Sequence, residues 1–260
     1  MPIRPTTELF GLAGQSAIVT AAGQGLGRQI ALRLANAGAA VIVTHRRIDG
    51  ARQVADEIIA AGGKALALEL DVSHVHQAAA TVAAAREWAG SLHALVNCAG
   101  GMHPFTPFLE VAEQTFDDTL ARNFKGAYFL SQAFARALVA DERSGRIVNI
   151  ASTAAFKPDF QLAAYNASKA ALISFTHSVA VELAPHRILV NAVVPGPVRT
   201  TNTEWIYDDP TWQAALAKAI PLGAPADPDD VAAAVLFMVS AASGHVTGST
   251  LTVDGGFMWK

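Results

Sequence analysis

The sequence predicts an α/β fold in which helices cover both faces of a seven-stranded parallel sheet. Three observations lead to this prediction. Short β-branched runs alternate with alanine-rich stretches of helical periodicity. The apolar runs are continuous, as in strands that are buried on both faces. Composition does not change along the 260 residues, so we expect one doubly wound domain, 1–260.

The predicted elements follow in order along the chain. The expected strands are residues 16–20, 40–44, 65–70, 93–97, 146–150, 188–194 and 249–253. Helical patterns lie between them, for example at 28–38, 49–62 and 76–90. The region from about 197 to 226 is different because it is rich in proline and holds two tryptophans. We expect it to form a lid, because ligands of such sheets bind at the carboxyl ends of the strands.

Composition and charge exclude several classes of function. The 19 basic and 22 acidic residues give a net charge of −3, which favours neither nucleic acid nor an anionic membrane as a partner. Cys98 is the single cysteine, which fits a reducing, cytoplasmic compartment. No apolar run approaches the roughly 18 residues of a membrane span, and no signal peptide is expected.

The stretch "TAAGQGLG", residues 20–27, joins the first predicted strand to a helix. Backbone N–H groups in such a turn, together with a helix N-terminus, can bind a pyrophosphate, as in a Rossmann-type domain. Gly25 and Gly27 would allow close backbone approach. The usual G-x-G-x-x-G fingerprint is not matched, because Arg28 stands where the third glycine would be. A tight turn without a ligand is the alternative.

The second predicted strand is followed by His45, Arg46 and Arg47 rather than by an acidic residue. A carboxylate would repel the 2′-phosphate of NADP, whereas guanidinium groups bind phosphate in a bidentate manner. The sequence therefore favours NADP(H) over NAD(H), which stays the alternative, with Arg46 as the principal contact. The other interpretation is that both arginines are solvated surface residues.

Tyr165 and Lys169 are four residues apart in a helix-compatible stretch, so they share one helix face. An ammonium beside a phenol favours the phenolate and should lower the pKa of the tyrosine. Such a tyrosine can exchange a proton with a carbinol oxygen. A surface tyrosine–lysine contact is the alternative, but the apolar stretch "AAYNASKAALISF" favours a functional pair.

Several motifs in fixed order resemble those of the classical short-chain dehydrogenases/reductases over nearly the whole chain. "TAAGQGLG" is similar to T-G-x-x-x-G-x-G, with Ala21 in place of the first glycine. "LDVS", "NCAG" and "ARNFKGAYF" follow, and Ser152 lies thirteen residues before the tyrosine of "YNASK". "VNAVVPGPVRT" and "HVTGSTLTVDGG" complete the series. The resemblance implies an NAD(P)-dependent oxidoreductase of carbonyl groups and secondary alcohols.

The resemblance implies a role for each of four catalytic residues. Tyr165 would be the general acid/base, and Ser152 would bind the substrate oxygen. Lys169 would hold the cofactor ribose, and Asn123 would seat a water of a proton relay. No metal is required. The glycine loop and the resemblance together imply these cofactor-binding residues: Thr20, Ala21, Gly23, Gln24, Gly25, Leu26, Gly27, His45, Arg46, Arg47, Asp71, Val72, Asn97, Ala99, Gly100, Tyr165, Lys169, Pro195, Gly196, Val198 and Thr200.

Three departures from the family pattern need attention. Ala21 should be tolerated if its φ is negative, and should cost about 1 kcal/mol otherwise. Cys98 replaces an asparagine, and we expect a small buried residue rather than a reactive thiol. Ala224 stands where many relatives carry arginine, so a local salt bridge would be missing.

The predicted substrate pocket lies between the nicotinamide and the lid. The candidate residues are Ser152, Ala154, Met102, His103 and Trp205, with Thr153, Phe156, Pro197, Ile206 and Tyr207 nearby. These positions hold no basic cluster, which favours an uncharged, fairly hydrophobic ketone or secondary alcohol. Phe257 and Trp259 follow the last strand, and the resemblance implies a homotetramer or homodimer in which this tail lies at an interface.

Three other functions stay open. A 3-oxoacyl-carrier-protein reductase would need a basic patch for its acidic carrier, and none is obvious. An NAD-dependent alcohol or sugar dehydrogenase would use the same catalytic residues with the other cofactor. A non-catalytic nucleotide-sensing protein would keep the fold, but such proteins typically lose the tyrosine or the lysine.

Overall fold

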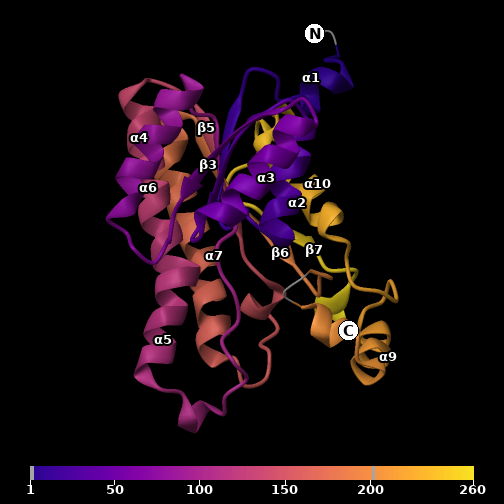
Figure 1. The fold of residues 1–260 in the computed structure, drawn as a ribbon. Helices are drawn as coiled ribbons and strands as arrows, with labels where there is room; N and C mark the ends of the chain where they lie inside the picture. Colours follow the sequence, from indigo (N-terminus) through magenta and orange to yellow (C-terminus); the bar gives the residue numbers. More distant parts are fainter. Residues whose placement is uncertain (1–2, 201–202) are drawn as a thin grey trace.

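The computed structural model describes residues 3–200 and 203–260, and the strands in these ranges form one parallel sheet (Figure 1). The strand order is β3-β2-β1-β4-β5-β6-β7. The strands are β1 (Ser16–Val19), β2 (Ala40–His45), β3 (Lys64–Glu69), β4 (Ala94–Asn97), β5 (Gly145–Ile150), β6 (Ile188–Pro195) and β7 (Thr250–Val253). The order reverses direction between β1 and β4, which is where ligands bind in doubly wound sheets. The predicted fold class is confirmed.

Helices cover both faces of the sheet, as the continuous apolar strands require (Figure 1). One layer contains α2 (Gly25–Asn36), α3 (Ile48–Ala60) and α10 (Pro228–Val239), packed on a core with Val19, Val41 and Val148. The other contains α4 (Gln77–Ala89), α6 (Gly126–Ala140) and α7 (Ala163–Leu183), packed on a core with Ile18 and Leu95. Neighbouring strand residues such as Ile18 and Val19 thus enter opposite cores, because side chains alternate across a strand.

Element boundaries differ from the predicted ones mainly where a functional loop joins a helix. Each strand begins and ends within about one residue of its predicted range, since apolar runs mark strands sharply. By contrast, α2 begins at Gly25, three residues before the periodic pattern at 28–38, because two glycines of the loop already belong to its first turn. Among the described residues, no helix has the length and hydropathy needed to cross a membrane.

The helix before β5 has an interruption that the sequence did not indicate. Between α5 (Glu113–Leu120) and α6, residues Ala121–Lys125 form a turn of π-helix. The residues on either side keep helical backbone angles, so the three pieces continue one another. Such π-bulges are rare, and they are frequent at functional sites. The turn contains Asn123, which is fully buried.

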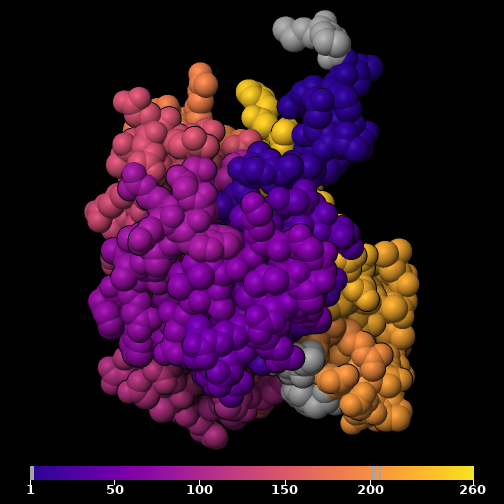
Figure 2. Space-filling model, turned by 45° about the horizontal axis from the view of Figure 1, so that its top comes forward, coloured from indigo at the N-terminus to yellow at the C-terminus, as the bar shows by residue number. Residues whose placement is uncertain are grey.

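The predicted lid region forms α8 (Glu204–Tyr207) and α9 (Pro210–Ala219), and its two ends meet. Val198 and Ala226 form an isolated parallel bridge, with hydrogen bonds from Ala226 N to Pro197 O (3.0 Å) and from Arg199 N to Ala226 O (3.2 Å). In Figure 2 the orange surface around α9 stands beside the indigo and purple surface of the N-terminal half. The loop is therefore closed at its base.

Candidate active site

The glycine loop connects β1 to α2 at the point where the strand order reverses. Gly25 has a φ of +54°, which a side chain would disfavour. A Cβ on Gly27 would lie 2.5 Å from the carbonyl oxygen of Ala21, so the helix can pack this closely on the loop only with glycine there. Gly27 thus allows the close packing of the helix on the loop, and the approach of a ligand to these glycines stays a prediction.

Ala21 adopts the strained one of the two backbone conformations that were considered for it. Its φ is +52°, in the left-handed region, and not in the negative range that would have made the alanine free of strain. A left-handed backbone brings Cβ close to the following carbonyl and costs about 1 kcal/mol or more. The loop nevertheless keeps its shape, because Ala22 N donates to the carbonyl oxygen of Thr44, 2.8 Å away.

Thr20 ties the glycine loop to the loop that follows β4. Its Oγ1 accepts hydrogen bonds from the backbone N–H groups of Cys98 and Ala99, both at 2.9 Å. Cys98 is half-buried, and desolvation raises the pKa of its thiol to about 12, which favours a structural residue over a nucleophile. The loops that follow β1 and β4, where the strand order reverses, are therefore held together as one unit.

A cleft of about 940 Å³ opens beside this unit. Its lining comes from the glycine loop, the starts of α2 and α3, the end of β2 and the base of the lid, and consists of Gly23, Gln24, Gly25, Arg28, Gln29, His45, Arg47, Asp49, Gly50, Gln53, Arg199, Thr200, Glu204 and Pro228. The size suits a dinucleotide-sized ligand. Glycine is required where His45 packs, because a Cβ on Gly23 or on Gly50 would come within 2.9 Å of the His45 ring.

The two adjacent arginines after β2 have different surroundings. Arg47 lines the cleft, whereas Arg46 is exposed and lies toward Asp71. Burial would raise the pKa of Asp71, but hydrogen bonds from Ser73 and the charges of His74 and Arg46 hold it below its usual value. The predicted adenine-binding aspartate and the predicted phosphate-binding arginine are thus close enough to interact.

Tyr165 and Lys169 both lie on α7, as their spacing predicts. The Lys169 Nζ atom is 5.9 Å from the centroid of the Tyr165 ring. Lys169 is buried, and its ammonium donates to the carbonyl oxygen of Ile150 at 2.8 Å. The last residue of β5 therefore positions the lysine beside the tyrosine.

Asn123 is held by backbone and side-chain groups from two other elements. Its Oδ1 accepts from Gly101 N at 2.9 Å, and its Nδ2 donates to Gly101 O at 3.1 Å and to Ser168 Oγ at 3.0 Å. Ser168 in turn donates to the carbonyl oxygen of Tyr165 at 2.7 Å. A Cβ on Gly100 would lie 3.1 Å from Asn123 Oδ1 and 3.3 Å from Lys169 Nζ, so the asparagine and the lysine flank this glycine.

Ser152 follows β5 and begins the short 3₁₀ turn Thr153–Ala155. Its Oγ accepts a hydrogen bond from Ala154 N at 3.1 Å and also hydrogen bonds to Tyr165, which lowers the tyrosine pKa. The structure therefore brings the four predicted catalytic residues together from three parts of the fold. Asn123 comes from the π turn, Ser152 from the end of β5, and the last two from α7.

The expected lowering of the Tyr165 pKa is not found. Burial raises the pKa of Tyr165 and outweighs the hydrogen bond from Ser152, and the Asp159 charge raises it further. The pKa of Lys169 also departs from its ordinary value, because burial lowers it to about 8. Desolvation dominates both groups, and its size depends on neighbours that a sequence pattern does not reveal.

The predicted substrate residues divide into exposed and buried groups. Met102 and Phe156 are exposed, Ser152 is half-buried, and Thr153, Ala154, His103 and Tyr207 are buried. His103 Nδ1 contacts the carbonyl oxygen of Pro104 at 2.7 Å, and its Nε2 is buried without a hydrogen-bond partner. Ile206 and Trp205 belong to α8, and the Trp205 side chain lies outside the described part of the structure.

Sequence reasoning missed a polar network inside the sheet. Asn97 Nδ2 donates to Asn149 Oδ1 at 2.8 Å and to Ser131 Oγ at 2.9 Å, and Asn149 Nδ2 donates to Thr176 Oγ1 at 2.9 Å. Asn97 and Asn149 are direct partners in the register of β4 and β5. An asparagine inside each apolar run was the available signal, because buried amides need partners.

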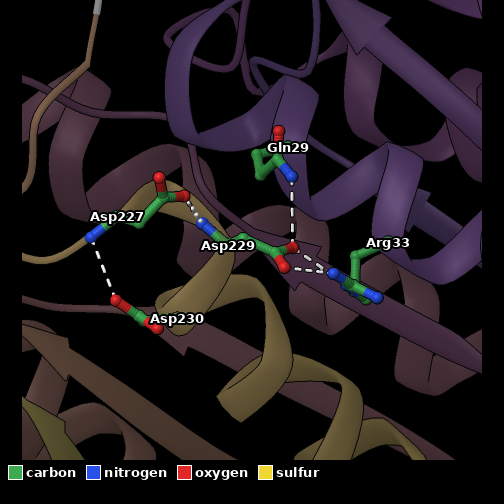
Figure 3. A network of polar contacts seen from close by, with 5 residues as sticks. All are labelled: Gln29, Arg33, Asp227, Asp229 and Asp230. Carbon is green, nitrogen blue, oxygen red and sulfur yellow. Dashed lines mark hydrogen bonds and ion pairs between the residues drawn. The ribbon is translucent and has the colours of Figure 1, made fainter.

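A second missed network anchors the base of the lid to the nucleotide helix (Figure 3). Asp227 caps α10, with Asp230 completing a capping box. Asp229 accepts hydrogen bonds from Gln29 Nε2 at 3.1 Å and from Arg33 Nε at 2.9 Å, and forms an ion pair with the same guanidinium. Asp229, three residues after the Val198–Ala226 bridge, is thereby tied to α2, whose first turn lines the cleft.

This fold and site define an oxidoreductase of the NAD(P)-binding Rossmann class. Comparisons with known proteins narrow the class. A family model described as enoyl-(acyl carrier protein) reductase matches residues 20–258. The chain belongs to the classical short-chain dehydrogenases/reductases, and is an NAD(P)-dependent enzyme of that family.

Individual relatives cover almost the full length of the chain. L-rhamnose 1-dehydrogenase (NAD(P)(+)) from Azotobacter vinelandii is 36% identical, covering 94% of this chain and 97% of the relative. 2-dehydro-3-deoxy-D-gluconate 5-dehydrogenase from Dickeya dadantii is 34% identical, covering 96% and 97%. The crystal structure of a gluconate 5-dehydrogenase from Burkholderia cenocepacia J2315, in complex with NADP and tartrate, superposes with a TM-score of 0.93 at 30% identity, covering 98% and 100%.

Proposed function

We propose that this protein is an NADP(H)-dependent oxidoreductase that interconverts a ketone and a secondary alcohol, with Tyr165 as general acid/base. The convergence of Ser152, Tyr165 and Lys169 beside the buried Asn123 carries the proposal. A phenol, a hydroxyl and an ammonium around one point are what proton exchange with a carbinol oxygen requires. The coarser statement, an NAD(P)-dependent oxidoreductase of small alcohols or carbonyl compounds, agrees with the relatives.

The residues of the cleft fit the cofactor. The N-terminus of α2 and the glycines at 23, 25 and 27 form a cradle for a pyrophosphate, since a helix N-terminus attracts an anion. Thr20 holds the loop that follows β4, and we expect Asp71 and Arg46 to bind the adenine end of the cofactor. When bound, NADPH supplies a hydride from its nicotinamide ring.

Each catalytic side chain has a separate task in the proposed reaction. Ser152 donates a hydrogen bond to the carbonyl oxygen as negative charge develops there. Tyr165 transfers its proton to that oxygen in reduction and accepts one in oxidation. Lys169, held by the Ile150 carbonyl, binds the cofactor ribose, and Asn123 holds Gly101 in place through its side-chain amide.

Arg46 and Arg47 support NADP(H) over NAD(H). Two guanidinium groups follow β2, one near Asp71 and the other in the lining of the cleft. We expect a guanidinium at one of these positions to bind a phosphate on the adenine ribose, which an acidic residue would repel.

The substrate is proposed to be uncharged. The Asp159 carboxylate is close enough to Tyr165 to raise its pKa, and Lys157 in the same loop already donates to two backbone carbonyls. A substrate carboxylate would therefore meet a like charge in the region of Tyr165. Exposed Met102 and Phe156 add apolar surface. An uncharged sugar, as named for the L-rhamnose relative, fits these charges better than a sugar acid.

The test of the function is turnover with and without the tyrosine hydroxyl. Purified protein is assayed for NADPH oxidation with ketones, ketoses and acyl thioesters, and Tyr165→Phe is compared with wild type. We expect kcat to fall by at least about 100-fold in the variant, which is a typical contribution of general acid catalysis, while NADPH binding is unchanged. Retained turnover in Tyr165→Phe would rule out the general-acid role.

Assembly and location are part of the same proposal. We expect a homotetramer or homodimer in the cytoplasm, the compartment that suits a chain with a single cysteine. A light-scattering mass of the purified protein tests the oligomeric state.

A further inference from the structure

Residues 254–260, which follow β7, fold into an ordered turn. Asp254 accepts hydrogen bonds from Gly256 N at 2.8 Å and from Met258 N at 2.9 Å, and Phe257–Trp259 form a 3₁₀ turn. Gly256 has a φ of +88°, and a Cβ there would lie 2.9 Å from Pro221. The segment is thus shaped by its own hydrogen bonds and by packing on the residues that follow α9.

Lys157 connects this segment to the catalytic loop, residues 151–162, which carries Ser152 and leads into α7. It lies between Ser152 and Tyr165 in the sequence, and its Nζ donates to the carbonyl oxygens of Phe257 and Lys260, both at 2.9 Å. The same ammonium lies 4.3 Å from the centroid of the Phe257 ring, within range of a cation–π interaction. Lys157 thereby contacts two main-chain carbonyl oxygens and one aromatic ring that lie about a hundred residues later in the sequence.

The segment also contacts the lid. Leu222 N donates to the carbonyl oxygen of Gly255 at 3.1 Å, and Lys260 Nζ donates to the carbonyl oxygen of Lys218 in α9. On its other side, Asp254 packs against Gly196, where a Cβ would lie 2.6 Å from the Asp254 Cβ. Residues 254–260 therefore bridge the catalytic loop, the end of α9 and the strand end at Pro195–Gly196.

We propose that Lys157 is a positioning residue, which sets substrate affinity by fastening the catalytic loop to residues 254–260 and, through them, to the lid. The inference rests on the proposed carbonyl reduction. Lys157 acts through the loop rather than on the reacting atoms, because its donor groups are directed to the Phe257 and Lys260 carbonyls. Small displacements of positioning groups change the fit of a substrate strongly.

The test compares Lys157→Met with Lys157→Arg. Methionine keeps an unbranched side chain but removes the donors, so we expect the KM for the carbonyl substrate to rise about tenfold. We expect kcat and the Kd for NADPH to stay within about twofold, because the cofactor cleft is lined by other residues. Arginine can donate to two carbonyls and stack on a ring, so Lys157→Arg should recover most of the KM. Lys64→Met, at the exposed start of β3, is the matched control.

A double-mutant cycle separates this role from general destabilisation. Phe257→Ala should raise the KM in a wild-type background. It should add little in the Lys157→Met background, since both substitutions remove the contact between the Lys157 ammonium and the Phe257 ring. Hydrogen exchange at Leu222 and Met258 should increase in Lys157→Met. An unchanged KM in Lys157→Met, fully additive effects, or equal losses with methionine and arginine would each overturn the proposal. If wild type reduces no carbonyl compound, the proposed function fails instead, and the hydrogen-exchange result still decides whether Lys157 fastens the segment.

Discussion

The ammonium of Lys169 and the carbonyl oxygen of Ile150 are 2.8 Å apart, in a site from which solvent is excluded. Backbone geometry at the end of β5 thus holds a charged side chain where burial opposes its charge. The consequence is a lysine pKa of about 8, well below the ordinary 10.5.

This pKa predicts a pH-dependent stability. Below about pH 8 the buried ammonium is charged in the folded state, and its full desolvation cost is present. Between about 8 and 10.5 the folded state binds fewer protons than the unfolded state, so the free energy of unfolding rises with pH. Lys169→Met should therefore stabilise the protein at pH 7, with a gain that shrinks toward pH 10. Urea unfolding at four pH values checks this, and a constant difference would contradict it.

Asp159 predicts a selectivity for uncharged substrates. Replacing its carboxylate by an amide in Asp159→Asn removes a like charge near Tyr165. We expect the preference for a neutral ketose over a matched keto acid to fall by about tenfold, the effect of roughly 1.4 kcal/mol. The pKa of Tyr165 should also decrease, which moves the rising limb of alcohol oxidation to lower pH. Steady-state kinetics over a pH range measure both, with Asp56→Asn on α3 as the control.

The two arginines after β2 predict the cofactor preference. Arg46→Ala should lower kcat/KM for NADPH by about tenfold or more, because a charge-assisted hydrogen bond contributes roughly 1.5–3 kcal/mol. The value for NADH should hardly change, since NADH lacks the 2′-phosphate. Arg46→Asp should reverse the preference. The matched variant Arg47→Ala shows which of the two arginines determines the preference. If the wild type had a higher kcat/KM for NADH than for NADPH, the interpretation of residues 45–47 as a phosphate site would be wrong.

Ala21 predicts a stabilising substitution. Its φ of +52° suits glycine, so Ala21→Gly should raise the free energy of unfolding by about 1 kcal/mol. Ala22 is the matched control, because it is buried and its φ is not positive. Ala22→Gly should instead lower the stability by about 0.5–1 kcal/mol through the entropy of the unfolded chain. Equal effects at the two positions would contradict the strain argument.

The sequence by itself determined the parallel sheet and predicted the candidate catalytic residues. Strands are read from local apolar runs, and the spacing of Tyr165 and Lys169 places them on one helix face whatever the rest of the chain does. The order of the short motifs was also specific for the family, because each motif depends on only a few adjacent residues.

Only the tertiary structure decided the properties that depend on distant neighbours. The pKa of Tyr165 is raised because burial outweighs the nearby polar groups, and the sign of that balance follows from how completely the fold excludes water. Likewise, Asn97 and Asn149 pair because β4 and β5 are adjacent in register. Lys157 meets Phe257 across a hundred residues of sequence. The Tyr165 pKa, the asparagine pair and the Lys157 contact all depend on packing between residues that are distant in the sequence. Local residue types and spacings therefore do not reveal them.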